Sequence, residues 1–185
     1  MTYIAQPFVA GTPEAKVVGQ VVQAFSENLA AERIAHLLPK HGLDNIDPEG
    51  WYPHQNWMNV LKDIAAEAND TETTFVAFGR KVVETAVMPP EMKTIEDALQ
   101  ALHAIHHLNL RNIPEDEGYH LEKLGPKHYL VHHNTPNPDS AIYGFIWGMA
   151  ARFVGAAESF KVTRRPDIQS DKGRSVFEVK WGIGV

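Results

Sequence analysis

The feature that most constrains the fold is a change in the spacing of apolar residues at Pro114. Upstream of this proline, apolar residues recur as they do on one face of an α-helix, and downstream they alternate as in a strand with one buried face. Helices followed by strands, without βαβ alternation, are typical of α+β proteins with an antiparallel sheet. We therefore predict an N-terminal helical bundle packed against a C-terminal antiparallel sheet with an inserted helix.

Four helices are predicted upstream of Pro114. Their approximate bounds are 13–38, 53–68, 71–87 and 94–109. Thr12 is suited to cap the first helix, with Pro13 at its first helical position. Thr94 and Asp97 form a near capping box at the start of the fourth.

Downstream of Pro114, two strands are predicted to pair through the turn Gly125-Pro126, and two more follow an apolar helix. The approximate bounds are 119–124 and 127–133 for the first pair, 142–153 for the helix, and 158–164 and 175–181 for the second pair. The chain has 185 residues, the size of one domain, so we treat residues 1–185 as a single α+β unit.

Composition excludes several classes of function. The formal net charge is −6 and no basic cluster is longer than Arg164-Arg165, which argues against a nucleic-acid-binding protein. The absence of cysteine excludes disulfides, thiolate metal sites and cysteine nucleophiles. No apolar run is long enough for a membrane span, and the N-terminus lacks a signal peptide, so we expect a cytoplasmic protein. Catalytic motifs such as GxSxG or a Walker loop are also missing, which favours a binding domain over an enzyme.

Seven of the ten histidines lie between His103 and His133. On the fourth predicted helix, His106 and Asn109 fall on the stripe set by Leu99 and Leu102 and should point inward. A buried polar side chain needs a hydrogen-bond partner. Either both side chains bond to nearby backbone and orient the helix, or they line a cavity and contact a polar group of a ligand.

His103, His106 and His107 also have the i, i+3, i+4 spacing with which a helix can present two imidazoles to a metal ion. The helix lacks the glutamate of an HExxH motif. Three histidines of the predicted strands could add a ligand: His128, His132 and His133. A mixture of one core histidine and several solvated ones is the simpler interpretation.

Aromatic residues mark two further places. Trp57 stands near the entrance of the second predicted helix, where core packing is the usual role and a pocket wall is the alternative. Gly144 and Gly148 share one face of the apolar helix, which indicates either tight packing on the sheet or space for a ligand. Tyr143 and Trp147 lie on a neighbouring face and could border the same space.

The order of several short motifs resembles the 4-vinyl reductase domain and is similar to bacterial haem-NO-binding-like sequences. The motifs are Ala98-Leu99-x-x-Leu102-x-x-x-His106-x-x-Asn109-x-Arg111-Asn112, Pro136-Asn137-Pro138, Tyr143-Gly144, Gly148, Arg152-Phe153 and Phe177-Glu178-Val179-Lys180-Trp181. Both families belong to the superfamily of ligand-binding domains in nitric oxide signalling and Golgi transport. The resemblance covers roughly residues 38–181.

This resemblance implies a helical bundle on an antiparallel sheet, often dimeric, with a cavity for a small hydrophobic or aromatic molecule, a fatty acyl chain or haem. By position, His106 and Asn109 would face the cavity, with Tyr143 and Trp147 on its far side. Haem-binding members use a helix histidine, for which His103 is the nearest match, and a Tyr-x-Ser-x-Arg triad, which this sequence lacks. The cysteines that hold zinc in many sensor members are also missing, so no cofactor is firmly implied and haem is possible.

We therefore predict a sensory domain that encloses a small, mostly apolar molecule and signals through a homodimer and a separate output protein. The predicted ligand-binding residues are His103, His106, Asn109, Trp57, Tyr143 and Trp147. One alternative is a haem-based sensor of a diatomic gas, with His103 or His106 on the iron. The other is a metal-dependent enzyme with histidine ligands.

Overall fold

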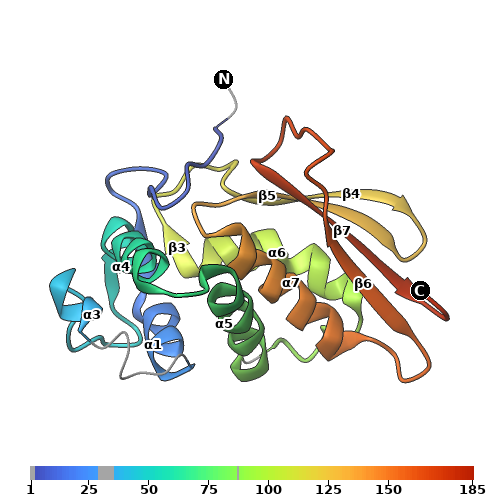
Figure 1. The fold of residues 1–185 in the computed structure, drawn as a ribbon, viewed down its shortest axis with the longest axis horizontal. Helices are drawn as coiled ribbons and strands as arrows, with labels where there is room; N and C mark the ends of the chain where they lie inside the picture. Colours follow the sequence, from blue (N-terminus) through green and yellow to red (C-terminus); the bar gives the residue numbers. More distant parts are fainter. Residues whose placement is uncertain (1–2, 29–35, 87) are drawn as a thin grey trace.

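The computed structural model describes residues 3–28, 36–86 and 88–185, and it confirms the α+β class (Figure 1). The helices are α1 Gly19–Asn28, α3 Leu37–Lys40, α4 His54–Glu67, α5 Thr71–Thr85, α6 Ile95–Asn109 and α7 Asp139–Phe153. The main antiparallel sheet has the order β4-β5-β7-β6, with β4 Gly118–Gly125, β5 His128–Asn134, β6 Ser159–Arg164 and β7 Ser175–Gly182. Within the described ranges, no helix is long and apolar enough to cross a membrane.

A second, small sheet was not predicted. It has the order β2-β1-β3, with β1 Lys16–Val18, β2 Trp51–Pro53 and β3 Leu110–Arg111. The predicted helix over 13–38 is therefore wrong at its start, and the Thr12 hydroxyl donates to the Asn112 carbonyl at 2.6 Å instead of capping a helix. Val17 pairs with Tyr52 on one side and Leu110 on the other, a long-range pairing that suits a β-branched residue. Residues 29–35 of that prediction lie outside the described residues.

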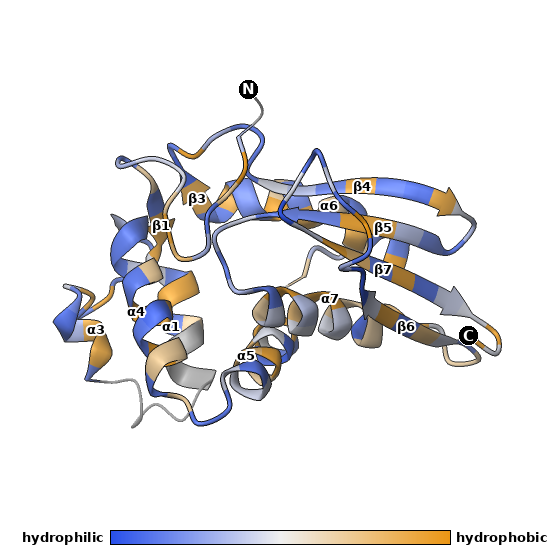
Figure 2. Cartoon of the chain, turned by 45° about the horizontal axis from the view of Figure 1, so that its top comes forward, coloured by the Kyte–Doolittle hydropathy of each residue, from blue (hydrophilic) through white to orange (hydrophobic). Residues whose placement is uncertain are grey.

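The other predicted elements are confirmed to within a few residues, because each carries a strong local signal. The capping box of α6 is complete, with the Thr94 hydroxyl accepting from the Asp97 N–H and the Asp97 carboxylate accepting from the Thr94 N–H. Along β4 and β7, hydrophilic and hydrophobic residues alternate (Figure 2). Phe177, Val179 and Trp181 of β7 are buried, while the intervening Glu178 and Lys180 are partly exposed.

The buried apolar residues form two separate cores. The larger core fills the space between α6, α7 and the main sheet, and its members include Leu99, Leu102, Ile146, Met149 and Phe177. The smaller core joins α1, α3, α4 and β1, with α5 and β3, and includes Val17, Val22, Leu37, Trp57, Leu61 and Phe75. Figure 1 shows α6 and α7 along one face of the main sheet, with α5 packed on α7.

Glycines bring α5 and α7 into backbone contact. A Cβ atom added at Gly144 would lie 2.2 Å from the carbonyl oxygen of Val76, and one added at Gly79 would lie 2.0 Å from the carbonyl oxygen of Ala141. Tight packing of the glycine face is thus confirmed, but the partner is α5 and not the sheet. The sequence did not reveal this partner because Gly79 is a single glycine within a helical pattern.

Candidate functional site

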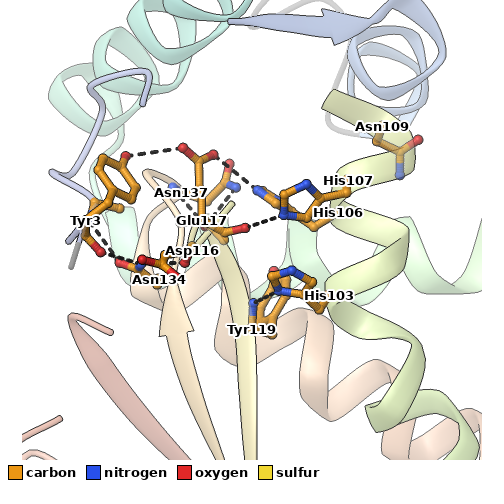
Figure 3. A network of polar contacts seen from close by, with 12 residues as sticks. Tyr3, His103, His106, His107, Asn109, Asp116, Glu117, Tyr119, Asn134 and Asn137 are labelled. Atoms are coloured by element: carbon orange, nitrogen blue, oxygen red, sulfur yellow. Dashed lines mark hydrogen bonds and ion pairs between the residues drawn. The ribbon is translucent and has the colours of Figure 1, made fainter. Parts of the chain in front are cut away.

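The stripe of apolar residues on α6 ends in a buried polar cluster. His106 is 8% exposed, and its Nε2 lies 3.1 Å from Oε1 of Glu117, whose side chain is fully buried. A carboxylate can only accept, so the imidazole donates this hydrogen bond. The Tyr3 hydroxyl donates to the other carboxylate oxygen at 3.2 Å. Figure 3 shows Glu117 between Tyr3 and His106, so His106 points inward as predicted and meets an acid.

Asn109 behaves differently from His106. Its Nδ2 donates to the carbonyl of Ile105, one turn earlier on the same helix, at 3.0 Å. Figure 3 shows it away from the Glu117 cluster. Its partner is therefore nearby backbone, which is the first of the two alternatives for this side chain.

His103 and His107 link α6 to the start of β4 by hydrogen bonds to its backbone. The Tyr119 N–H donates to Nδ1 of His103 at 3.3 Å, and Nε2 of His107 donates to the Glu117 carbonyl at 2.8 Å. The ring of His120 lies 5.4 Å from that of His103. Burial, followed by the neighbouring imidazoles, lowers the pKa of His103. These side chains satisfy backbone groups at the edge of the sheet, which explains part of the histidine enrichment on α6.

The alternative of a histidine-ligated metal site finds no support in this arrangement. In the part of the chain that the structure describes, no three histidine or acidic side chains are placed to hold a metal ion. The histidines of β5 are committed elsewhere: His128 contacts Glu178 at 2.7 Å and His132 contacts Ser170 at 2.7 Å. Strand alternation sends these two rings to the sheet face opposite α6, since their neighbours Tyr129 and Val131 belong to the core beneath α6.

The residues around His103 do not fit haem in this arrangement. Because Nδ1 of His103 accepts a backbone hydrogen bond, the neutral ring carries its proton on Nε2 and offers no lone pair there for iron. The space between α6 and α7 is filled by apolar side chains, among them Leu102 and Ile146, both at most 1% exposed. Binding of a macrocycle would require both the imidazole and these side chains to move.

The three predicted aromatic residues lie apart. Trp57 is 3% exposed within the smaller core. The Tyr143 ring lies 6.5 Å from Phe177 in the larger core. Trp147 packs 5.2 Å from Phe160, and the guanidinium of Arg80 lies 3.9 Å from its ring centroid. The structure thus brings His103 and His106 together but does not gather all six predicted residues around one space.

Sequence reasoning missed His54, a buried residue at the start of α4. His54 is the first residue of α4, is 2% exposed, and donates its backbone N–H to the Ala15 carbonyl at 2.8 Å. Among the residues that the structure describes, its Nδ1 is the one buried side-chain polar atom without a hydrogen-bond partner. Burial lowers the pKa of His54 to about 4, with an opposing effect of Glu117 and a further lowering by His106.

Asn134, at the end of β5, holds the N-terminal segment over this cluster. Its Oδ1 accepts from the Ala5 N–H at 2.8 Å, and its Nδ2 donates to the carbonyls of Tyr3 at 2.9 Å and Asp116 at 2.7 Å. A Cβ atom added at Gly11 would lie 2.1 Å from Oε2 of Glu117, so the backbone there approaches the carboxylate closely. No local pattern predicts the contacts made by the N-terminal segment, because their partners are more than a hundred residues apart.

A second buried network lies at the start of α7. His133 is fully buried, with Nε2 2.7 Å from the Thr135 hydroxyl and Nδ1 3.1 Å from the Ser175 hydroxyl. Burial lowers the pKa of His133 to about 4. Asp139 lies 3.6 Å from its Nδ1 and pairs with Arg174 at 2.7 Å. Both Thr135 and His133 are inaccessible to solvent, and the network joins β5, β7 and α7.

Comparison with known proteins supports the fold. No family model and no curated protein matches this sequence. Solved structures of H-NOX domains do match. An F78L variant of Tt H-NOX has a TM-score of 0.65 at 14% identity, over 91% of this chain and 96% of that chain. An oxygen-binding H-NOX domain related to soluble guanylate cyclases has a TM-score of 0.63 at 13% identity, over 90% and 93%. An H-NOX protein from S. oneidensis in the Fe(II)NO ligation state has a TM-score of 0.59 at 16% identity, over 91% and 99%.

These likenesses confirm the haem-NO-binding-like half of the resemblance at the level of fold, while the link to 4-vinyl reductase domains stays a prediction. At this identity they establish architecture and not ligand. The chain has the α+β fold of H-NOX domains.

Proposed function

We propose that this protein is a sensory domain that binds a small, mostly apolar molecule between its helices and its sheet. The observation that carries the proposal is the buried polar cluster: a fully buried carboxylate, Glu117, contacted by His106 and Tyr3 where the helical bundle meets the sheet. An apolar core does not need such a group, and burying it is costly unless it is fully paired. Convergent polar groups among apolar walls are typical of ligand sites.

Native mass spectrometry of the protein as isolated tests this proposal. We expect a fraction of the molecules to retain a small molecule that is lost on denaturation. The proposal fails if the native mass equals that of the bare chain and no small apolar compound shifts the melting temperature.

A haem-based gas sensor is the second candidate, and the H-NOX likeness favours it, since one similar structure is an oxygen complex and another has NO on Fe(II). His103 on α6 is the residue we would assign to the iron, although its present hydrogen bond opposes that role. Titration with haem decides between the candidates. A Soret shift that disappears in His103→Ala would support haem binding, and no shift in the wild type would remove this candidate.

We further propose that the protein acts in the cytoplasm as a homodimer that passes its signal to a separate output protein. Light scattering coupled to gel filtration tests the dimer, and a mass of one chain at micromolar concentration would contradict it.

A further inference from the structure

A row of basic side chains crosses the face of the main sheet that is turned away from α6 and α7. The face toward these helices contributes Tyr129 and Phe177 to the larger core. Strand alternation therefore turns His128, Lys180 and Lys161 to the opposite face. His128 pairs with Lys180, and Lys180 pairs with Lys161, so these three positions lie side by side on β5, β7 and β6. We call these three residues the basic row.

The basic row has too few carboxylates to balance it. Lys161 and Lys180 are direct neighbours on paired strands, and like charges in these positions destabilise a sheet. Glu178 contacts Lys180 at 2.8 Å, His128 at 2.7 Å and Arg165 at 3.0 Å. The hydrogen bond from Lys180, with those from His128 and Arg165, lowers the pKa of Glu178 to about 2, so three basic groups share its single negative charge. Among the residues that the structure describes, no acidic side chain pairs with the Lys161 ammonium.

The sign of the charge on this part of the chain is opposite to that of the whole protein. Residues 1–127 contain 10 Lys or Arg and 18 Asp or Glu, whereas residues 128–185, from β5 to the C-terminus, contain 7 and 5. The formal net charge of −6 therefore comes from the segment before β5. A basic surface on an acidic protein attracts acidic partners and repels other copies of the same acidic surface.

Exposed apolar side chains lie at the end of the sheet where the basic row begins. Leu124, just before the turn between β4 and β5, is 47% exposed, and Ile183 and Val185, which follow β7, are 87% and 48% exposed. Figure 1 shows this turn and the C-terminus at the same end of the main sheet. His128 is the first residue of β5 after the turn. Exposed apolar side chains bordered by charged ones are typical of protein–protein contacts.

We propose that the basic row is the docking surface for the output protein, which contacts it with an acidic segment. Carboxylates of that segment relieve the repulsion between Lys161 and Lys180 and give Lys161 the partner that it lacks. The inference rests on the proposed separate output protein and specifies the chemistry of its contact.

The spacing of the row fits a protein segment better than a single anion. Neighbouring strands lie about 4.8 Å apart, so the three positions span about 10 Å. Carboxylates one turn apart on a helix have Cβ atoms about 5–6 Å apart, and two of them match this span. A second copy of this chain fits less well, because a contact between its acidic part and the basic row is head-to-tail and does not close.

Fluorescence anisotropy with labelled hexaglutamate as the acidic probe tests the proposal. We expect saturable binding at low salt that weakens at least about fivefold at about 0.3 M salt, because the charges are exposed and screened. Lys161→Gln should weaken binding about threefold, and Lys161→Gln combined with Lys180→Gln at least about tenfold, since each exposed ion pair contributes up to about 1 kcal/mol. The matched control is Lys62→Gln, because Lys62 is an exposed lysine on α4 and its loss changes the net charge equally. This variant should bind hexaglutamate as the wild type does.

Thermal unfolding of the same variants separates docking from a structural role. Lys161→Gln should keep or raise the melting temperature, because it removes a like-charge neighbour of Lys180. A lower melting temperature for Lys161→Gln would show that this lysine stabilises the sheet, and it would overturn the assignment to docking.

The remaining outcomes separate this inference from the proposed function. The inference is overturned if the wild type does not bind hexaglutamate, or if Lys62→Gln weakens binding as much as Lys161→Gln. Tighter binding to a short single-stranded DNA or to vesicles that contain phosphatidylserine would overturn the choice of a protein partner. A mass in light scattering that grows at low salt for the wild type, and not for Lys161→Gln, would assign the row to a second copy of this chain instead. None of these results affects the retention of a small molecule in native mass spectrometry, which tests the sensory function by itself.

Discussion

Acid should destabilise this protein well above the pH at which its carboxylates become protonated. His54 and His133 are both buried, and burial lowers the pKa of each from 6.5 to about 4. In the unfolded chain both imidazoles bind protons as the pH falls below 6.5, whereas in the folded chain they stay neutral. The unfolded state then binds more protons, so the free energy of unfolding decreases from about pH 6.5 down to about pH 4.

The size of this loss follows from the two pKa values. Between about pH 7 and about pH 5, each histidine costs about 2 kcal/mol, and the pair costs about 4 kcal/mol. Asp139 and Glu178 act in a different window, because their folded pKa values are about 2 and their contributions are lost only as the pH falls below their ordinary values of 3.8 and 4.5. Between about pH 5 and about pH 6.5, the decrease in the free energy of unfolding therefore comes from the two buried histidines and not from these carboxylates.

Urea unfolding followed by circular dichroism at about pH 7, 6 and 5 measures the effect. His54→Phe should reduce the pH-dependent loss by about 2 kcal/mol, half of the total for the pair. His36→Gln is the control, since the His36 side chain is 59% exposed, and it should follow the wild type. A His54→Phe profile parallel to the wild type would show that His54 is protonated in the folded state and would refute the reasoning.

Three further predictions concern packing, the N-terminal segment and a helix cap. Gly144→Ala places a methyl group 2.2 Å from the Val76 carbonyl oxygen and should lower the free energy of unfolding by at least about 2 kcal/mol. The control Gly125→Ala adds a methyl group with nothing within 4 Å and should change the free energy of unfolding by less than about 0.5 kcal/mol. Equal effects of the two variants in chemical denaturation would contradict the α5–α7 contact. Asn134→Ala removes three hydrogen bonds to backbone groups and should lower the free energy of unfolding by about 2–3 kcal/mol. It should also speed proteolysis near the N-terminus, and an unchanged cleavage rate would show that Asn134 does not hold this segment in place. Thr94→Ala removes the cap of α6 and should cost about 1 kcal/mol by thermal unfolding, and no change would mean that the capping box contributes nothing.

Local sequence patterns were sufficient to predict a helix or strand wherever the residues of that segment favour one of the two by themselves. The capping box at Thr94 and Asp97 located the start of α6, and the alternation downstream of Pro114 located all four strands of the main sheet. The same reasoning failed at Lys16–Val18, because a valine-rich segment is compatible with a helix and a strand until partners are known. There the pairing with β2 and β3 decided the outcome.

The candidate site shows the same division more sharply. The position of His106 on an apolar stripe is a property of the helix period, so the sequence determined that this imidazole would point inward. Its partner Glu117, the unpaired His54 and the Tyr3 hydroxyl come from a loop, another helix and the N-terminus. Only the tertiary structure could select them, because contacts between distant segments are set by how complete elements pack, which leaves no periodic trace in any one of them.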